Sequence, residues 1–325
     1  MESGPSSGAS LADGALADGA PNGGPSLAPV AGVSAHISDL RTILFDMDGV
    51  LYLGDSPLPG VQATFDYLES TGRKYCLITN NSTMTPGQYV EKLARMGVTV
   101  AEDRILTAGV ATARYLARLE PDGAPVYVIG ERGLLEALQA HGFRLDDRAP
   151  RYICVGLDRG LTYEKLKIAT LAIRAGARFI AANPDTTLPT EEGLVPGNGA
   201  TLAAIQTATD VEPLVVGKPS AAIVDLAVEM LGAEKSTTAI IGDRLDTDVL
   251  AGQRAGIGRI LILTGVHQPS DIPDFEGKPN WIVSDLADLI RQLDRQPDGA
   301  QASSTQASST QAPTTPTPTA KKQRP

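Results

Sequence analysis

The sequence has few cysteines, few basic residues for its acidic content and no long apolar run, and each shortage excludes a class of protein. Its two cysteines, Cys76 and Cys154, lie in strand-like apolar stretches. We expect buried reduced thiols there, rather than a disulfide framework or a metal clip. No run approaches the roughly 20 apolar residues that span a bilayer, and the N-terminus has no basic stretch followed by a hydrophobic one. We therefore expect no membrane span and no secretory signal, and a cytoplasmic protein.

Basic residues are outnumbered, with 28 Lys and Arg against 38 Asp and Glu and a net charge of −10. Such a balance argues against nucleic acid as a partner, because phosphate backbones attract basic surfaces. It still allows a small phosphorylated metabolite, whose charge one metal ion and one lysine can meet. The three histidines, His36, His141 and His267, are too widely spaced to suggest a metal cluster. His267 either lines a cleft or, as we favour, lies on the surface.

Both ends of the chain are of low complexity. Residues 1–36 are rich in Gly, Ala, Ser and Pro with a tandem LADGA repeat, and residues 297–325 hold a tandem QASST repeat and a Thr/Pro run. Neither segment has apolar periodicity, so neither can offset the entropy lost on ordering its backbone. We predict that both tails are disordered.

Between the tails, short β-branched runs alternate with helical patterns, as in TILFDMD followed by VQATFDYLEST. Strands this apolar are buried on both faces, which predicts an α/β protein with a Rossmann-like, doubly wound parallel sheet. Residues 37–120 and 213–296, the latter opening with the strand-like PLVVGK, are assigned to this core. Residues 121–212 have their own strand and helix alternation and are predicted to form a second, inserted α/β domain.

Polar clusters follow four of the strands assigned to the core. In chain order they are Asp46 and Asp48; Thr79, Asn80 and Asn81; Lys218; and Asp243 with Asp246 and Asp248. A single carboxylate at a strand end could be a helix N-cap. Four polar clusters converging on one edge of a sheet are not explained by caps, because their unpaired carboxylates would repel one another strongly unless a divalent cation lay among them. Because Mg²⁺ prefers oxygen ligands and needs only two or three carboxylates, we predict a magnesium site.

The same residues suit phosphoryl transfer. Asp46 directly follows the apolar run ILF, so a rigid strand can hold it as the nucleophile that forms an aspartyl-phosphate. Asp48, two residues later, can protonate the leaving oxygen and then activate water. Thr79 and Asn80 can donate hydrogen bonds to the phosphoryl group, and Lys218 can balance its charge.

The ordered motifs DMDGV, ITNNS, VVGKP and IGDRLDTD resemble those of the haloacid dehalogenase superfamily. The segments DGVLYLGDSPLPG, AANPDTTLPTEEGLVPGNGA and GDRLDTDVLAGQRAG are similar to its class IIA branch, which includes NagD-like, 4-nitrophenyl, phosphoglycolate and pyridoxal phosphatases. The resemblance covers residues 38–295. It implies an inserted cap of the C2 type over the site and a homodimer formed through that cap.

Carried over by position, the resemblance implies Mg²⁺ bound by Asp46, Asp243 and the main-chain carbonyl of Asp48. It implies that Asp248 supports the metal site or Lys218 from behind, and that Asn80 and Asn81 lie near the phosphate. At GNGA, Asn198 stands where Ala, Thr or Ser is expected, which puts the contact between cap and core there in question.

The cap segment NPDTTLP resembles the loop that reaches the catalytic centre, with Leu188 as a substrate-binding residue. Because Leu188 is apolar, we hypothesise that phosphoglycolate-like or aryl phosphates are preferred over pyridoxal phosphate. Two other functions remain open at this level. One is a phosphotransferase or mutase on the same scaffold, and the other is a non-catalytic regulator resembling a receiver domain.

Overall fold

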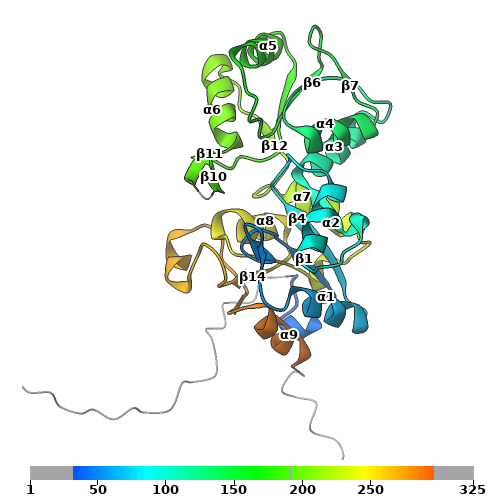
Figure 1. The fold of residues 1–325 in the computed structure, drawn as a ribbon, viewed down its shortest axis with the longest axis vertical. Helices are drawn as coiled ribbons and strands as arrows, with labels where there is room; N and C mark the ends of the chain where they lie inside the picture. Colours follow the sequence, from blue (N-terminus) through cyan, green and yellow to red (C-terminus); the bar gives the residue numbers. More distant parts are fainter. Residues whose placement is uncertain (1–31, 191, 296–325) are drawn as a thin grey trace, which may run out of the picture.

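The structure, a computed structural model, describes residues 32–190 and 192–295 (Figure 1). The predicted disordered tails 1–36 and 297–325 lie outside this range, except for residues 32–36. The main-chain N–H of Ser34 donates to the carbonyl of Ser236 at 2.9 Å, and its hydroxyl donates to Asp39 at 2.8 Å. These two hydrogen bonds tie the segment to the folded chain.

Six parallel strands form the larger sheet, in the order β15, β14, β13, β1, β4, β5. The chain runs outward from β1 to β5 on one side and then builds β13 to β15 on the other, so the strand order reverses between β1 and β13. Ligands bind at the carboxyl ends of strands beside such a reversal. The predicted doubly wound parallel sheet is confirmed. The strands are β1 (Thr42–Phe45), β4 (Lys74–Thr79), β5 (Ile105–Thr107), β13 (Thr238–Gly242), β14 (Gly258–Ile262) and β15 (Trp281–Val283).

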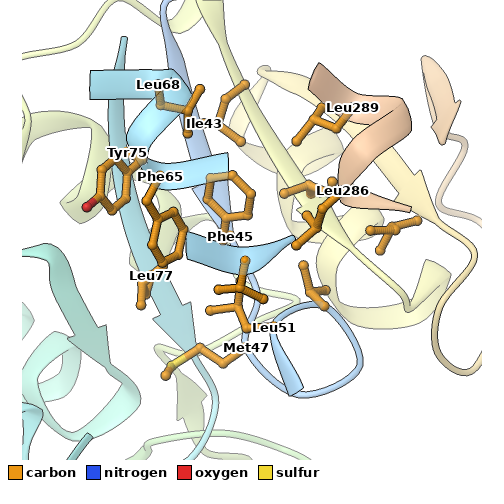
Figure 2. Close-up of a cluster of buried hydrophobic side chains, with 14 of the residues drawn as sticks. Ile43, Phe45, Met47, Leu51, Phe65, Leu68, Tyr75, Leu77, Leu286 and Leu289 are labelled. Carbon is orange, nitrogen blue, oxygen red and sulfur yellow. The ribbon is translucent and has the colours of Figure 1, made fainter. Parts of the chain in front are cut away.

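Side chains alternate between the two faces of β1. Ile43 and Phe45 lie in one apolar cluster and Leu44 in another on the opposite side of the sheet. In the first cluster the ring of Phe65 stacks on Tyr75, with centroids 4.7 Å apart, and meets Phe45 edge-on at 5.7 Å (Figure 2). Packing on both faces makes β1 a rigid support for whatever follows it. The helices of this domain are α1 (Val61–Ser70), α2 (Pro86–Arg95), α3 (Ala108–Leu119), α7 (Ala221–Met230), α8 (Leu250–Ala255) and α9 (Leu286–Asp294).

A second parallel sheet forms the cap, in the order β12, β9, β8, β6, β7. A hairpin of β10 and β11 extends from the cap toward the core (Figure 1). The cap elements are β6 (Pro125–Ile129), α4 (Arg132–Ala140), β7 (Arg144–Leu145), β8 (Tyr152–Val155), α5 (Tyr163–Arg174), β9 (Arg178–Ala181), β10 (Thr187–Thr190), β11 (Gly193–Pro196), α6 (Asn198–Thr209) and β12 (Leu214–Val215). The remaining short elements are β2 (Tyr52–Leu53), β3 (Ser56–Pro57) and the 3₁₀ helices Ile37–Asp39, Glu102–Arg104, Lys235–Thr237 and Pro269–Asp274.

One strand assigned to the core from sequence belongs to the cap. Leu214 and Val215 of PLVVGK pair in parallel with Ile180 and Ala181 of β9, at the edge of the cap sheet. The prediction that this run is a core strand is therefore wrong. An apolar run predicts that a strand will form but not which sheet it will join. Here the strand pairs with β9 of the cap. Lys218 thus reaches the core from the last cap strand.

The two domains share buried apolar residues. A single cluster runs from Leu106 and Leu116 of the core to Leu134 and Tyr152 of the cap, and α3 packs against both α4 and α7. Cys76 and Cys154 are free and buried, as predicted. Within residues 32–190 and 192–295, no helix combines the length and the apolar character that crossing a bilayer requires.

Candidate active site

Asp46 immediately follows β1 and is 8% exposed. Its main-chain N–H donates to the carbonyl of Ile241 on the neighbouring strand at 2.9 Å, which continues the sheet pairing by one residue. Its Oδ1 accepts a hydrogen bond of 2.6 Å from Nζ of Lys218. The position of Asp46 is therefore fixed by hydrogen bonds of both its main chain and its side chain.

Lys218 is 2% exposed and lies between two carboxylates. Its Nζ is 2.6 Å from Oδ1 of Asp46 and 2.5 Å from Oδ1 of Asp248. Burial opposes the charged ammonium, but Asp248 and Asp46 outweigh it and raise the pKa of Lys218 above its ordinary value. Lys218 is thus a permanent cation inside the protein.

A π-helix, Leu245–Val249, turns Asp248 back toward the end of β13. The Oδ2 of Asp248 accepts from the main-chain N–H of Arg244 at 3.2 Å, so both of its oxygens are engaged by the protein. Gly242 makes this approach feasible, since a Cβ there would lie 2.2 Å from Cγ of Asp248. Asp248 contacts Lys218 directly, in line with its predicted supporting role.

Asp243 has one oxygen without a partner. Its Oδ2 accepts from the main-chain N–H of Val266 at 2.8 Å, while Oδ1 is buried with no hydrogen bond. Two glycines enclose this carboxylate: a Cβ on Gly49 would lie 2.5 Å from Oδ2, and one on Gly265 would lie 2.0 Å from it. A buried, unpaired carboxylate oxygen is costly unless something positive binds it.

Oxygens of Asp46, Asp243 and Asp248 lie within 4.8 Å of one another. Burial, followed by the charge of Asp248, raises the pKa of Asp46 well above its ordinary value. The same two causes raise the pKa of Asp243 to about 6. Three carboxylates face one ammonium, so the site has an excess of negative charge.

This donor set fits a hard divalent cation such as Mg²⁺, which takes oxygen ligands and keeps several waters. Asp46 and Asp243 would hold it, because both oxygens of Asp248 are already used. The side chain of Asp48 lies outside the three-carboxylate cluster. Its predicted share in metal binding is through the main-chain carbonyl and stays a prediction.

Asp48 differs from Asp46 in that it is exposed. Its Oδ2 accepts from the hydroxyl of buried Tyr52 at 3.4 Å. The surrounding protein still displaces enough water to raise the pKa of Asp48 above its ordinary value, against the charge of Lys92, whose Nζ lies 4.1 Å from the centre of the Tyr52 ring. A solvent-accessible carboxyl group with a raised pKa can hold and release a proton, as the predicted acid and base must.

The three residues after β4 make different contacts. Thr79 accepts at Oγ1 from the main-chain N–H of Asn81 at 3.1 Å, and Asn81 accepts at Oδ1 from both donors of Thr83 at 2.8 Å. Asn80 donates from Nδ2 to Asp185 and to the carbonyl of Lys218, each at 2.9 Å. With both amide hydrogens used, a phosphate contact by Asn80 would need its main chain. The predicted phosphate-binding roles of these three residues stay predictions.

Other residues near the strand ends have clear structural contacts. Arg244 forms a two-point ion pair with Asp246, at 3.0 and 2.8 Å. His267 accepts at Nδ1 from the N–H of Leu245 at 3.1 Å and meets Phe275 edge-on at 4.5 Å, so its ring packs against the loop after β13. Leu188, the predicted substrate contact, is half-buried on β10.

The cap residues Asn183 and Asp185 make contacts that were not predicted from the sequence. They bond to Asn80 from across the domain junction, at 2.6 and 2.9 Å. Both belong to NPDTTLP, the segment singled out for Leu188, and two polar residues at the end of a predicted strand were the available signal. Nothing in the sequence indicated that they contact Asn80 rather than solvent.

Comparisons with known proteins agree with this geometry. Residues 43–144 match the family described as haloacid dehalogenase-like hydrolase, and residues 215–289 match a related HAD-hydrolase-like family. An acid sugar phosphatase of Staphylococcus aureus is 40% identical over 256 residues, which cover 78% of this chain and 98% of that protein.

Two solved structures are similar over their whole length. A 4-nitrophenylphosphatase from Thermotoga maritima is 36% identical, with a TM-score of 0.76, and the match covers 79% of this chain and 98% of that one. NagD from E. coli K-12 is 35% identical, with a TM-score of 0.72, and the match covers 76% and 97%. The non-catalytic receiver-like alternative is therefore wrong. The chain belongs to the haloacid dehalogenase-like hydrolases, in the class IIA branch with NagD and the 4-nitrophenylphosphatases, and is a phosphoric monoester hydrolase.

Proposed function

We propose that this enzyme is a Mg²⁺-dependent phosphatase that hydrolyses a small phosphorylated metabolite through an aspartyl-phosphate on Asp46. The observation that carries the proposal is the unbalanced charge at the end of β1. Three buried carboxylates surround the ammonium of Lys218, and Oδ1 of Asp243 is buried without a partner. A divalent cation would balance this excess of negative charge and would then allow a phosphate group to bind beside the carboxylates.

The proposed reaction has two steps. Lys218 holds Oδ1 of Asp46, which leaves Oδ2 to attack phosphorus while the bond from phosphorus to the ester oxygen breaks. Asp48 gives its proton to the leaving oxygen. It then takes a proton from water as the water oxygen attacks phosphorus, and the bond to Asp46 breaks to release inorganic phosphate. Asp46 and Asp243 would hold Mg²⁺, which when bound would supply positive charge to offset that of the carboxylates and the phosphate.

The test is release of inorganic phosphate from 4-nitrophenyl phosphate with and without Mg²⁺, for wild type and Asp46→Asn. We expect Asp46→Asn to lose at least ~10³-fold in kcat, because the amide cannot act as the nucleophile. Asp66→Asn, on the exposed face of α1, is the matched control and should keep wild-type turnover. Wild-type inactivity, or full activity of Asp46→Asn, would sink the proposal.

The same assay separates hydrolysis from phosphoryl transfer. A phosphotransferase or mutase would place the phosphoryl group on a sugar hydroxyl and release little free phosphate. Adding a sugar as acceptor and quantifying both phosphate and phosphorylated sugar distinguishes the two. We expect free phosphate to equal 4-nitrophenol released.

For the substrate we propose phosphoglycolate-like, sugar or aryl phosphates ahead of pyridoxal phosphate. The half-buried apolar Leu188 on the cap hairpin offers no polar contact to a pyridine ring. The names of the similar acid sugar phosphatase and 4-nitrophenylphosphatase support the first group. Parallel kcat/KM measurements on one substrate of each kind decide it, and a clear preference for pyridoxal phosphate would refute this choice. A single contact discriminates by only about 1–3 kcal/mol.

We also propose that the enzyme is cytoplasmic and forms a homodimer through its cap. Light scattering coupled to size-exclusion chromatography should give twice the chain mass of 33.9 kDa. A monomer at micromolar concentration would remove the dimer from the proposal and leave the chemistry unaffected.

A further inference from the structure

A line of buried side-chain amides crosses the junction between cap and core. It starts at Asn198, the first residue of α6, which is 1% exposed. Its Nδ2 donates to the carbonyl of Asn183 at 2.6 Å and to that of Val155 at 3.3 Å. The amide therefore links the end of β8 and the segment after β9 to the start of α6.

The line continues into the core at Asn80. The Nδ2 of Asn183 donates to the main-chain carbonyl of Asn80 at 2.6 Å. The Nδ2 of Asn80 in turn donates to Oδ1 of Asp185 and to the main-chain carbonyl of Lys218. Two cap residues thus hold Asn80 by its carbonyl and by its amide, and Asn80 holds the main chain of Lys218.

The orientation of these amides follows from their partners. Each of Asn198 and Asn80 faces two acceptors with the same side-chain atom, and only the NH₂ group can serve two acceptors. The Oδ1 atoms of both residues are buried without a partner. The protein leaves two acceptors unsatisfied so that both donors of each amide are used, which indicates that the donated bonds are the ones that matter.

Lys218 connects this line of amides to the carboxylates of the proposed active site. Its carbonyl receives Asn80, and its ammonium joins Asp46 to Asp248. Gly217, the preceding residue, lies against the same junction: its N–H donates to the carbonyl of Ala182, and a Cβ there would lie 2.3 Å from that oxygen. A shift of the cap loop would therefore move the main chain of Lys218.

We propose that Asn198, Asn183 and Asp185 form, with Asn80, an amide relay that positions Lys218 for phosphoryl transfer. The inference rests on the proposed function and deepens it. Asn198 and Asp185 are positioning residues that act through Asn80 and not on the substrate. An Ala, Ser or Thr at 198, which the resemblance to the family led us to expect, would have no NH₂ group to bridge the two carbonyls that Asn198 contacts.

The test compares variants that keep or remove one hydrogen bond. Asp185→Ala removes the acceptor for Asn80, whereas Asp185→Asn keeps an oxygen there and loses only charge. Asn198→Asp keeps the shape and removes the donors, and Asn198→Ala removes the whole amide. Asn280→Ala, which removes a core hydrogen bond to the N–H of Arg259 at 3.1 Å, is the matched control for loss of an ordinary amide contact.

We expect Asp185→Ala and Asn198→Asp to lower kcat for 4-nitrophenyl phosphate by roughly 10–100-fold, the usual range for residues that orient a site from behind. KM should change less than about 3-fold, since the substrate touches neither residue. Asp185→Asn and Asn280→Ala should stay within about 3-fold of wild type in kcat. If Asn198→Asp does not fold, the comparison of Asp185→Ala with Asp185→Asn is sufficient by itself, because Asp185 is only half-buried.

Three results would overturn the relay. A raised KM at constant kcat would make Asp185 a substrate contact, an equal loss in Asp185→Asn and Asp185→Ala would make its charge the required feature, and unchanged kcat in both alanine variants would make the line structural only. Each of these requires an active wild type. An inactive wild type would instead sink the proposed function, so the two failures are distinguishable.

Discussion

The molecule has two lysine–aspartate pairs of the same length, one at the strand ends of the core sheet and one in the cap. In the core, Nζ of Lys218 is 2.6 Å from Asp46; in the cap, Nζ of Lys165 is 2.6 Å from Asp158. The core lysine side chain is 3% exposed and also contacts Asp248, whereas that of Lys165 is 34% exposed and also donates to the carbonyl of Gly160. Length alone therefore does not separate the pair at the proposed active site from one that closes a loop.

The charge around each pair separates them. Lys165 and Asp158 balance one to one, and Asp158 completes its hydrogen bonds with the N–H of Gly160 at 2.9 Å. Lys218 faces Asp46 and Asp248, with Asp243 beside them and one oxygen of Asp243 unpartnered. A buried excess of negative charge is unstable by itself and needs a cation. The cap pair is balanced and needs no further cation. The following predictions test this contrast.

Among the variants that test this contrast, the largest effect is expected for Lys218→Met, which removes the cation and keeps the length of the side chain. Asp46 and Asp248 would then repel each other without compensation, and the phosphoryl group would lose its charge partner. We expect kcat to fall by about 10²–10³-fold. We expect stability without Mg²⁺ to fall by roughly 3–5 kcal/mol. Steady-state kinetics and denaturant unfolding measure the two, and an active, equally stable variant would contradict both.

A smaller effect is expected for Gly265→Ala. The added Cβ would lie 2.0 Å from Oδ2 of Asp243, so this carboxylate must move. We expect the Mg²⁺ concentration for half-maximal activity to rise by roughly 10–100-fold. In the cap, Gly160→Ala would place a Cβ 3.3 Å from Oδ1 of Asp158 and serves as the control. Equal Mg²⁺ requirements in the two variants would show that Asp243 is not a ligand.

The pH dependence should be smaller still. The pKa of Asp243 is raised to about 6, so below that pH a proton competes with the cation for its carboxylate. Without metal, the folded state binds this proton more tightly than the unfolded state does, so stability should fall as pH rises from the ordinary aspartate value toward 6. The gain in melting temperature on adding Mg²⁺ should therefore increase as pH rises through 6. A gain independent of pH from 5 to 7.5 would contradict the assignment.

The smallest effect is expected for Lys165→Met in the cap. This lysine is partly exposed and its pair is balanced, so we expect a stability loss of no more than ~1 kcal/mol. Turnover should be unchanged. A loss of turnover comparable to that of Lys218→Met would mean that the contrast between the two pairs is mistaken.

Much of the core could be predicted because local patterns specify it. Apolar runs such as TILF become parallel strands when both faces must be covered, and the strand Thr42–Phe45 falls within the predicted run TILFDMD. Asp46 and Asp243 come together because the parallel strands β1 and β13 present their ends to one edge, and the π-helix after β13 returns Asp248 to the same place. Lys218 joins them although its strand belongs to the cap sheet.

Partner choice could not be predicted. Leu214 and Val215 were assigned to a core strand because a run of apolar residues does not specify which sheet it will join. The role of Asp185 was missed for a related reason: its partner, Asn80, lies 105 residues away in the chain. Hydrogen bonds between distant segments depend on how domains dock, and the hydrophobic periodicity of the sequence does not predict them.

The amino-acid order by itself determined the class of fold and the acidic cluster, because short-range patterning sets strand burial and strand ends set the position of side chains. Tertiary structure alone decided that the last cap strand delivers Lys218, that Asp243 keeps a bare oxygen, and that cap amides hold Asn80. The physical reason is that burial and pairing are properties of surfaces in contact, which exist only once the two sheets have packed together.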